Sequence, residues 1–76
     1  MEIRDRVYNV ATKVLDLDRS ILNEELSIGD VRTWDSLGQV SLISALEKEF
    51  GCEFDIDETL EMESIGDILE IIKERS

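Results

Sequence analysis

The sequence contains no histidine and no proline, and its single cysteine is Cys52. Without histidine, a Ser-His-Asp or Cys-His nucleophilic site cannot be assembled, so we expect no catalytic activity of its own. One cysteine cannot close an internal disulfide, and with no histidine it cannot build a structural zinc site. Cys52 is therefore expected to be a reduced thiol that packs as a small hydrophobic side chain, with a redox role as the alternative.

Basic residues are also scarce, with 8 Lys and Arg against 19 Asp and Glu and a formal net charge of -11. A nucleic-acid partner needs a basic face, which this chain lacks, and anionic membrane surfaces are disfavoured for the same reason. No apolar run approaches transmembrane length, and the amino-terminal segment mixes charged with apolar residues, unlike a signal peptide. We therefore expect a cytoplasmic protein without membrane insertion.

Hydrophobic residues make up 42% of the chain and recur at helical spacing, which indicates a folded helical protein rather than a disordered acidic one. The pattern predicts a first helix over residues 3–14, a loop over 16–33, a second helix from Asp35 or Ser36 to about Phe50, a short helix over 57–62 and a last helix from about 65. The expected fold is an all-α four-helix bundle, with three longer helices, one short helix and a long loop between helices 1 and 2. We expect residues 1–76 to form a single monomeric domain.

Particular side chains are assigned to the core of this bundle. Gly51 is expected to cap the second helix in a left-handed conformation, and Ser64 to begin a capping box for the last helix. The expected core and anchoring residues are Ile3, Val7, Val10, Ala11 and Val14 in the first helix, Leu22, Leu26, Ile28 and Val31 in the loop, Leu42, Ile43, Leu46 and Phe50 in the second helix, Leu60 and Met62 in the short helix, and Ile65, Ile68, Leu69 and Ile72 in the last.

The acidic residues do not form a recognisable metal site. Asp55, Asp57, Thr59 and Glu61 alternate like the oxygen ligands of a calcium loop, but the glycine and the spaced glutamate of an EF-hand are missing. No metal site is therefore predicted. The carboxylates are expected to form a solvated surface that steers the protein toward basic patches on partners.

The most informative segment is Trp34-Asp35-Ser36-Leu37-Gly38, at the start of the second predicted helix. Helix capping alone explains an aspartate and a serine at such a place. The triplet Asp35-Ser36-Leu37, the helix that follows it, the acidity and the length of the chain together resemble the acyl carrier proteins. That resemblance covers essentially the whole chain and implies that Ser36 carries a 4'-phosphopantetheine arm, placed there by a phosphopantetheinyl transferase.

The resemblance also implies residues that recognise partners. Asp35 would help to present magnesium and coenzyme A to the transferase, besides acting as an N-cap worth about 1 kcal/mol. Leu37 would be an apolar contact for acyl-loading and acyl-transferring enzymes with basic docking patches, and Val40 and Glu47 would extend that surface. The alternative for Leu37 is an ordinary exposed leucine.

The chain departs from the commonest pattern of the family just after the triplet. In Gly38-Gln39-Val40-Ser41-Leu42 two positions that are usually acidic are neutral, which favours a specialised pathway over the housekeeping fatty-acid enzymes. Gly38 indicates either a close approach of the arm or of a partner, or ordinary tolerance near a helix end. Trp34 is expected to be a structural anchor, with a place beside the arm as the alternative.

Two other functions share this fold. One is an acidic adaptor that never carries an arm. The other is an aminoacyl or peptidyl carrier, although the Gly-Gly-x-Ser pattern usual in peptidyl carriers is absent. The cargo itself is not encoded in any recognisable motif.

Overall fold

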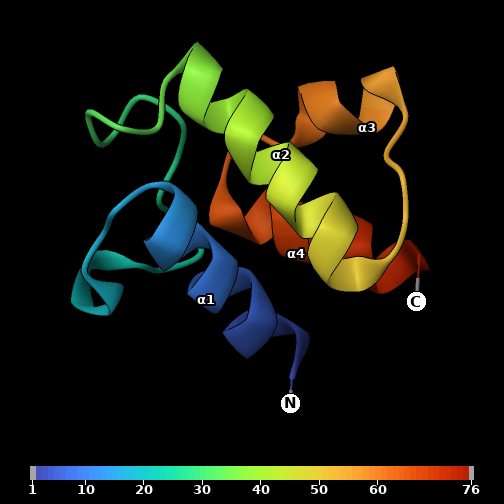
Figure 1. Cartoon of the computed structure of the whole chain (residues 1–76), viewed down its shortest axis with the longest axis horizontal. Helices are drawn as coiled ribbons and strands as arrows, with labels where there is room; N and C mark the ends of the chain where they lie inside the picture. Colours follow the sequence, from blue (N-terminus) through green and yellow to red (C-terminus); the bar gives the residue numbers. More distant parts are fainter. Residues whose placement is uncertain (1, 76) are drawn as a thin grey trace.

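The computed structural model describes residues 2–75, and these residues form four α-helices and one short 3-10 helix (Figure 1). The elements, in chain order, are α1 (Ile3–Val14), η1 (Arg19–Ile21), α2 (Ser36–Phe50), α3 (Ile56–Glu61) and α4 (Ile65–Arg75). α1 packs against α2 and α4, and α3 packs against α4. Within residues 2–75 no strand forms, although an isolated β-bridge joins Ser27 to Ser64. The predicted all-α fold and the long loop before α2 are confirmed.

The ends of α2 follow from local chemistry. Asp35 precedes the helix in an extended conformation and accepts a hydrogen bond from the N–H of Gly38. At the other end Gly51 has φ of 63°, the left-handed conformation predicted for it, and its N–H donates to the Glu47 carbonyl. α4 has a matching start, because the Asp67 N–H donates to Ser64 Oγ.

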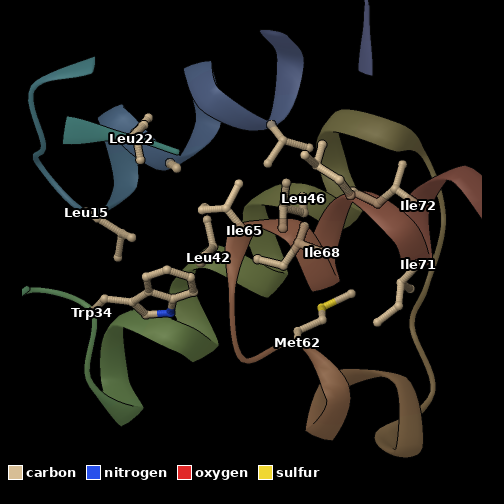
Figure 2. Packing of buried hydrophobic residues seen from close by; sticks show 13 residues of the cluster. Leu15, Leu22, Trp34, Leu42, Leu46, Met62, Ile65, Ile68, Ile71 and Ile72 are labelled. Atoms are coloured by element: carbon tan, nitrogen blue, oxygen red, sulfur yellow. The ribbon is translucent and has the colours of Figure 1, made fainter. Parts of the chain in front are cut away.

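The core lies between α1, α2 and α4, and Trp34 enters it from the long loop (Figure 2). Most of the predicted core residues are buried, and Ile43 and Phe50 are half-buried against them. No polar or charged residue is fully buried among residues 2–75. The buried set is Val7, Ala11, Leu15, Leu22, Trp34, Leu42, Leu46, Met62, Ile65, Ile68, Leu69, Ile71 and Ile72.

The long loop is held by backbone hydrogen bonds as well as by its apolar side chains. The Ile65 N–H donates to the Leu26 carbonyl at 2.9 Å, and the Ile28 N–H donates to the Glu63 carbonyl at 2.8 Å. Leu22 is buried and Leu26 half-buried, as predicted. The prediction for Ile28 is wrong, because its side chain is 37% exposed and it is the backbone at this position that fastens the loop.

The short helix α3 begins one residue earlier than predicted and is held largely by polar contacts. Met62 is buried as expected, but Leu60 is 70% exposed, so the prediction that it holds the helix is wrong. The Asp55 N–H donates to Glu58 Oε1 at 2.9 Å, and Arg75 Nε donates to Glu58 Oε2 at 3.0 Å. The hydrogen bond from Arg75 lowers the pKa of Glu58, because it stabilises the ionised carboxylate.

Gly38 is required by the packing of the chain against itself. A Cβ at this position would lie 2.1 Å from the Thr33 carbonyl oxygen and 3.2 Å from Leu15 Cδ2. The preceding loop therefore gives a reason for glycine at this position that was not predicted from the sequence, and an approach of the arm or of a partner stays a prediction. A glycine here lets the loop that carries Trp34 turn tightly into α2.

We predict that Gly38→Ala destabilises the protein by about 1–3 kcal/mol, because the new methyl group forces the loop or the helix to shift. On helix propensity alone the same change would stabilise α2 by about 1 kcal/mol. Urea unfolding followed by circular dichroism measures the difference. Ser41→Ala, at an exposed position of the same helix, is the control and should not destabilise. A Gly38→Ala variant as stable as Ser41→Ala would contradict the steric account.

Candidate functional site

Ser36 is the first residue of α2, and its side chain is exposed to solvent. Asp35 turns its carboxylate back onto the helix, with Oδ1 2.8 Å from the Gly38 nitrogen, while its own carbonyl accepts from the Gln39 N–H at 2.8 Å. The capping role predicted for Asp35 is therefore present in the structure. The hydroxyl of Ser36 is therefore exposed at the capped start of α2.

The helix start suits an anionic group on Ser36. The first N–H groups of a helix have no intrahelical acceptor, and the cap formed by Asp35 uses that of Gly38, so those of Ser36 and Leu37 remain to face an anion. The positive end of the dipole of a 15-residue helix points the same way. A phosphodiester on the Ser36 oxygen therefore fits, with the negative Asp35 held in its capping hydrogen bond beside it.

Leu37 and Val40 form an apolar patch next to this serine, which we call the docking patch. Leu37 is 80% exposed and Val40 67% exposed, and their spacing of three residues places them on one face of α2. Leu37 is thus even more exposed than the half-exposed position expected from the first turn of a helix. α3 contributes a second apolar pair that the sequence did not reveal, Ile56 at 78% and Leu60 at 70% exposed.

Glu47 lies near the other end of α2, away from the docking patch. Its Oε2 accepts a hydrogen bond from the Phe54 N–H at 2.9 Å, and its side chain is half-buried. The residue fastens the segment that leads into α3. A role for Glu47 in partner recognition stays a prediction, and that role would have to coexist with this internal bond.

Trp34, Gln39 and the carbonyl of Met62 meet beside the first turn of α2. The contacts of Gln39 and of the Met62 carbonyl were not predicted from the sequence. Trp34 is fully buried, as expected of an anchor, and its indole Nε1 donates to Gln39 Oε1 at 2.6 Å. Gln39 Nε2 donates in turn to the Met62 carbonyl, at 2.7 Å. The sequence did contain a signal for these contacts, because its only glutamine follows its only tryptophan by five residues. The amide of a glutamine can accept one hydrogen bond from an indole and donate another elsewhere.

Cys52 lies in a different place, away from Ser36. It lines a cavity of about 210 Å³ together with Ile3, Arg6, Phe50, Ile72 and Arg75. Arg6 stacks on the Phe50 ring at 4.3 Å and pairs with Glu49, so this cavity is bordered by side chains that already have partners. Cys52 is half-buried there, as a small hydrophobic side chain would be.

Among residues 2–75 no group of three or more Cys, Asp or Glu side chains is placed to hold a metal ion. None of the helices described is both long and apolar enough to cross a bilayer.

A small helical bundle that displays one serine at a capped helix start, and builds no catalytic constellation around it, has the form of a carrier domain. The family described as "phosphopantetheine attachment site" matches residues 5–72, a range that contains this serine. The chain is 32% identical over 74 residues to the acyl carrier protein of Phenylobacterium zucineum, covering 97% of this chain and 94% of that protein. It is 32% identical over 74 residues to the acyl carrier protein of Thermosynechococcus vestitus, covering 97% and 91%. It is 30% identical over 74 residues to that of Rickettsia canadensis, covering 97% and 86%.

The chain belongs to the acyl carrier protein family. It is a carrier with a covalently attached 4'-phosphopantetheine, as the resemblance implied. Proteins of this family are modified by a phosphopantetheinyl transferase and interact with biosynthetic enzymes.

The capping geometry of Asp35 leads to a prediction about stability. Asp35→Ala removes the acceptor for the Gly38 N–H and should cost about 1 kcal/mol of unfolding free energy. Asp35→Asn keeps an acceptor oxygen and should stay within about 0.5 kcal/mol of the parent protein. Urea unfolding of the three proteins checks this. Equal losses in both variants would show that charge, and not the cap, is what Asp35 contributes.

Proposed function

We propose that Ser36 is the attachment site, and that the protein holds acyl intermediates as thioesters on this arm without catalysing their reactions. The observation that carries the proposal is an exposed serine at the N-terminus of α2, within the segment that matches the attachment family. Ser64, the serine at the start of α4, is only half-exposed, and its Oγ already accepts the Asp67 N–H. The protein supplies the position, and the reactive thiol comes with the arm.

Attachment requires little from the chain itself. The oxygen of Ser36 forms a new bond to the β-phosphorus of coenzyme A, and the bond from that phosphorus to the departing adenosine 3',5'-bisphosphate breaks. The hydroxyl proton must pass to a base on the transferase, because this chain has no histidine. Asp35, next to the serine, is placed to help hold magnesium and coenzyme A in that complex, as the family resemblance suggests.

We propose the docking patch, Leu37 and Val40, as the apolar contact for partner enzymes. A leucine 80% exposed beside the attachment serine is a surface that a partner pocket can desolvate. The net charge of -11 would draw in partners with basic patches, at a rate that falls as salt rises. Glu47 would belong to the acidic part of this surface.

The aminoacyl or peptidyl carrier is the competing function, and it differs from our proposal only in its cargo. We further propose that residues 1–76 form a monomeric single domain, that the protein is cytoplasmic and that it serves a specialised pathway. The charge, the single cysteine and the neutral positions after Leu37 support these parts of the proposal.

The attachment is tested by incubating the protein with coenzyme A and a broad-specificity phosphopantetheinyl transferase and recording its intact mass. We expect a gain of one phosphopantetheine group in the parent protein and none in Ser36→Ala. Ser41→Ala, another exposed serine of α2, is the control and should be modified normally. A gain that survives Ser36→Ala would place the arm elsewhere, and no gain in any variant would favour the adaptor.

The docking patch is tested by the kinetics of the same reaction. Leu37→Asp should lower kcat/KM of the transferase about tenfold, because it puts a charge where the partner buries an apolar side chain. Leu60→Asp is the matched control, since Leu60 is a similarly exposed leucine on α3. Equal rates for the two variants would refute the assignment of Leu37, and circular dichroism establishes that both are folded.

A further inference from the structure

Beside Ser36, the Gln39 side chain borders the buried core of the bundle. Gln39 follows Ser36 by three residues, so the two side chains share a face of α2. The Gln39 amide joins the buried indole of Trp34 to the backbone of Met62, where α3 ends. A group on an arm attached to Ser36 would meet Gln39 before it met the apolar core.

Behind Gln39 the space is filled. Trp34, Leu42, Met62 and Ile65 are each no more than 1% exposed, and Figure 2 shows the Trp34 ring pointing inward toward the other core residues. Three cavities elsewhere on residues 2–75 are lined by other side chains, and not by Ser36, Gln39 or Trp34. An apolar chain would therefore have to displace the close-packed side chains behind Gln39.

Polar bonds, as well as packing, keep this end closed. α3 spans only six residues, and its Ile56 and Leu60 face solvent. One tie from α2 to the α3 region is the bond from the Phe54 N–H to Glu47, and the other is the bond from Gln39 to the Met62 carbonyl. Only the second of these ties lies at the Ser36 end.

We propose that Gln39 is a specificity-determining residue that keeps the cargo out of the bundle, so that this carrier presents its thioester exposed to solvent. To admit an apolar chain, the Gln39 amide must release both Trp34 and Met62, which leaves buried polar groups without partners. Cargo that gains little from burial, meaning short or polar acyl groups, is favoured accordingly. This inference rests on the proposed attachment at Ser36.

The test loads the Ser36 arm with acetyl or octanoyl groups, by giving the transferase acetyl- or octanoyl-coenzyme A. The rate of thioester cleavage by hydroxylamine is then followed by intact mass. In the parent protein we expect the octanoyl-to-acetyl rate ratio to match that of the free acyl-pantetheines within about twofold. In Gln39→Ala, which removes the bonds and opens space, octanoyl cleavage should slow about tenfold, an effect that burial of about two methylene groups supplies.

Lys48→Ala is the matched control, because it truncates another long side chain at an exposed position of α2. The fluorescence of Trp34, the only tryptophan, gives a second measurement. Its emission should not change on octanoyl loading of the parent protein and should shift in Gln39→Ala. If Gln39→Ala does not fold, Gln39→Met, which keeps the bulk and loses both bonds, takes its place.

Two results would overturn the inference. One is an octanoyl thioester that is protected in the parent protein, and the other is a Gln39 variant that folds and gives the parent ratio. If neither Gln39 variant folds, the parent protein's own rate ratio and Trp34 emission decide. Failure of the proposed function is distinct from these outcomes, because Ser36 would then take up no acyl-phosphopantetheine at all.

Discussion

The hydrogen bonds of the Gln39 amide fix where the start of α2 sits. Trp34 donates to one end of this amide, and the other end donates to the Met62 carbonyl. The end of the long loop, the first turns of α2 and, 23 residues farther along the chain, the end of α3 are thereby held at one point. Each such bond contributes only about 0.5–1.5 kcal/mol net, but leaving a buried partner unsatisfied costs about 1–3 kcal/mol. The junction therefore specifies the arrangement more than it stabilises it, and Gly38 makes the close approach of the loop possible.

Arginine side chains link different parts of the fold through ion pairs. The ion pairs found among residues 2–75 join Arg4 to Glu24, Arg6 to Glu49, Arg19 to Asp5 and Arg75 to Glu58. Each links segments far apart in sequence, though exposed pairs contribute at most about 1 kcal/mol. From Ser36 to Leu46 the chain has no charged residue at all. Long-range attraction of a basic partner must therefore come from acidic residues elsewhere on the surface. The exposed side chains at the start of α2 that such a partner would contact are apolar.

The sequence was sufficient for elements whose cause is local. α1 and α2 have the predicted bounds, because helical periodicity and the residues Asp35 and Gly51 act within one or two turns. The position of Ser36 at the helix start follows from the same cap. The buried state of Trp34 was also foreseen, since a large indole gains most from burial.

The remainder depends on tertiary contacts that no local pattern records. Leu60 was predicted to be a core residue, but α3 is short and packs only one of its faces against the bundle. Met62 and the ion pair of Glu58 with Arg75 make the contacts of that face, and Leu60 is left exposed. Ile28 is exposed, and its segment is anchored by a backbone hydrogen bond to Glu63 instead. The sequence showed Gly38 and Gln39 only as departures from a family pattern. In the structure, Gly38 lies against Thr33 and Leu15. Gln39 forms hydrogen bonds with Trp34 and Met62.

The two ends of α2 therefore have different roles. Glu47 lies eleven residues beyond Ser36, about 16 Å along the helix, and it bonds the backbone that leads into α3. A partner that engages the start of α2 closely enough to reach Ser36 meets Leu37 and Val40, which carry no internal task. Farther along α2, Leu42 and Leu46 are buried in the core and Glu47 is bonded to the Phe54 backbone, although Ser41, Ser44 and Lys48 stay exposed. The apolar surface of α2 that is free for a partner is therefore concentrated in its first two turns, beside Ser36.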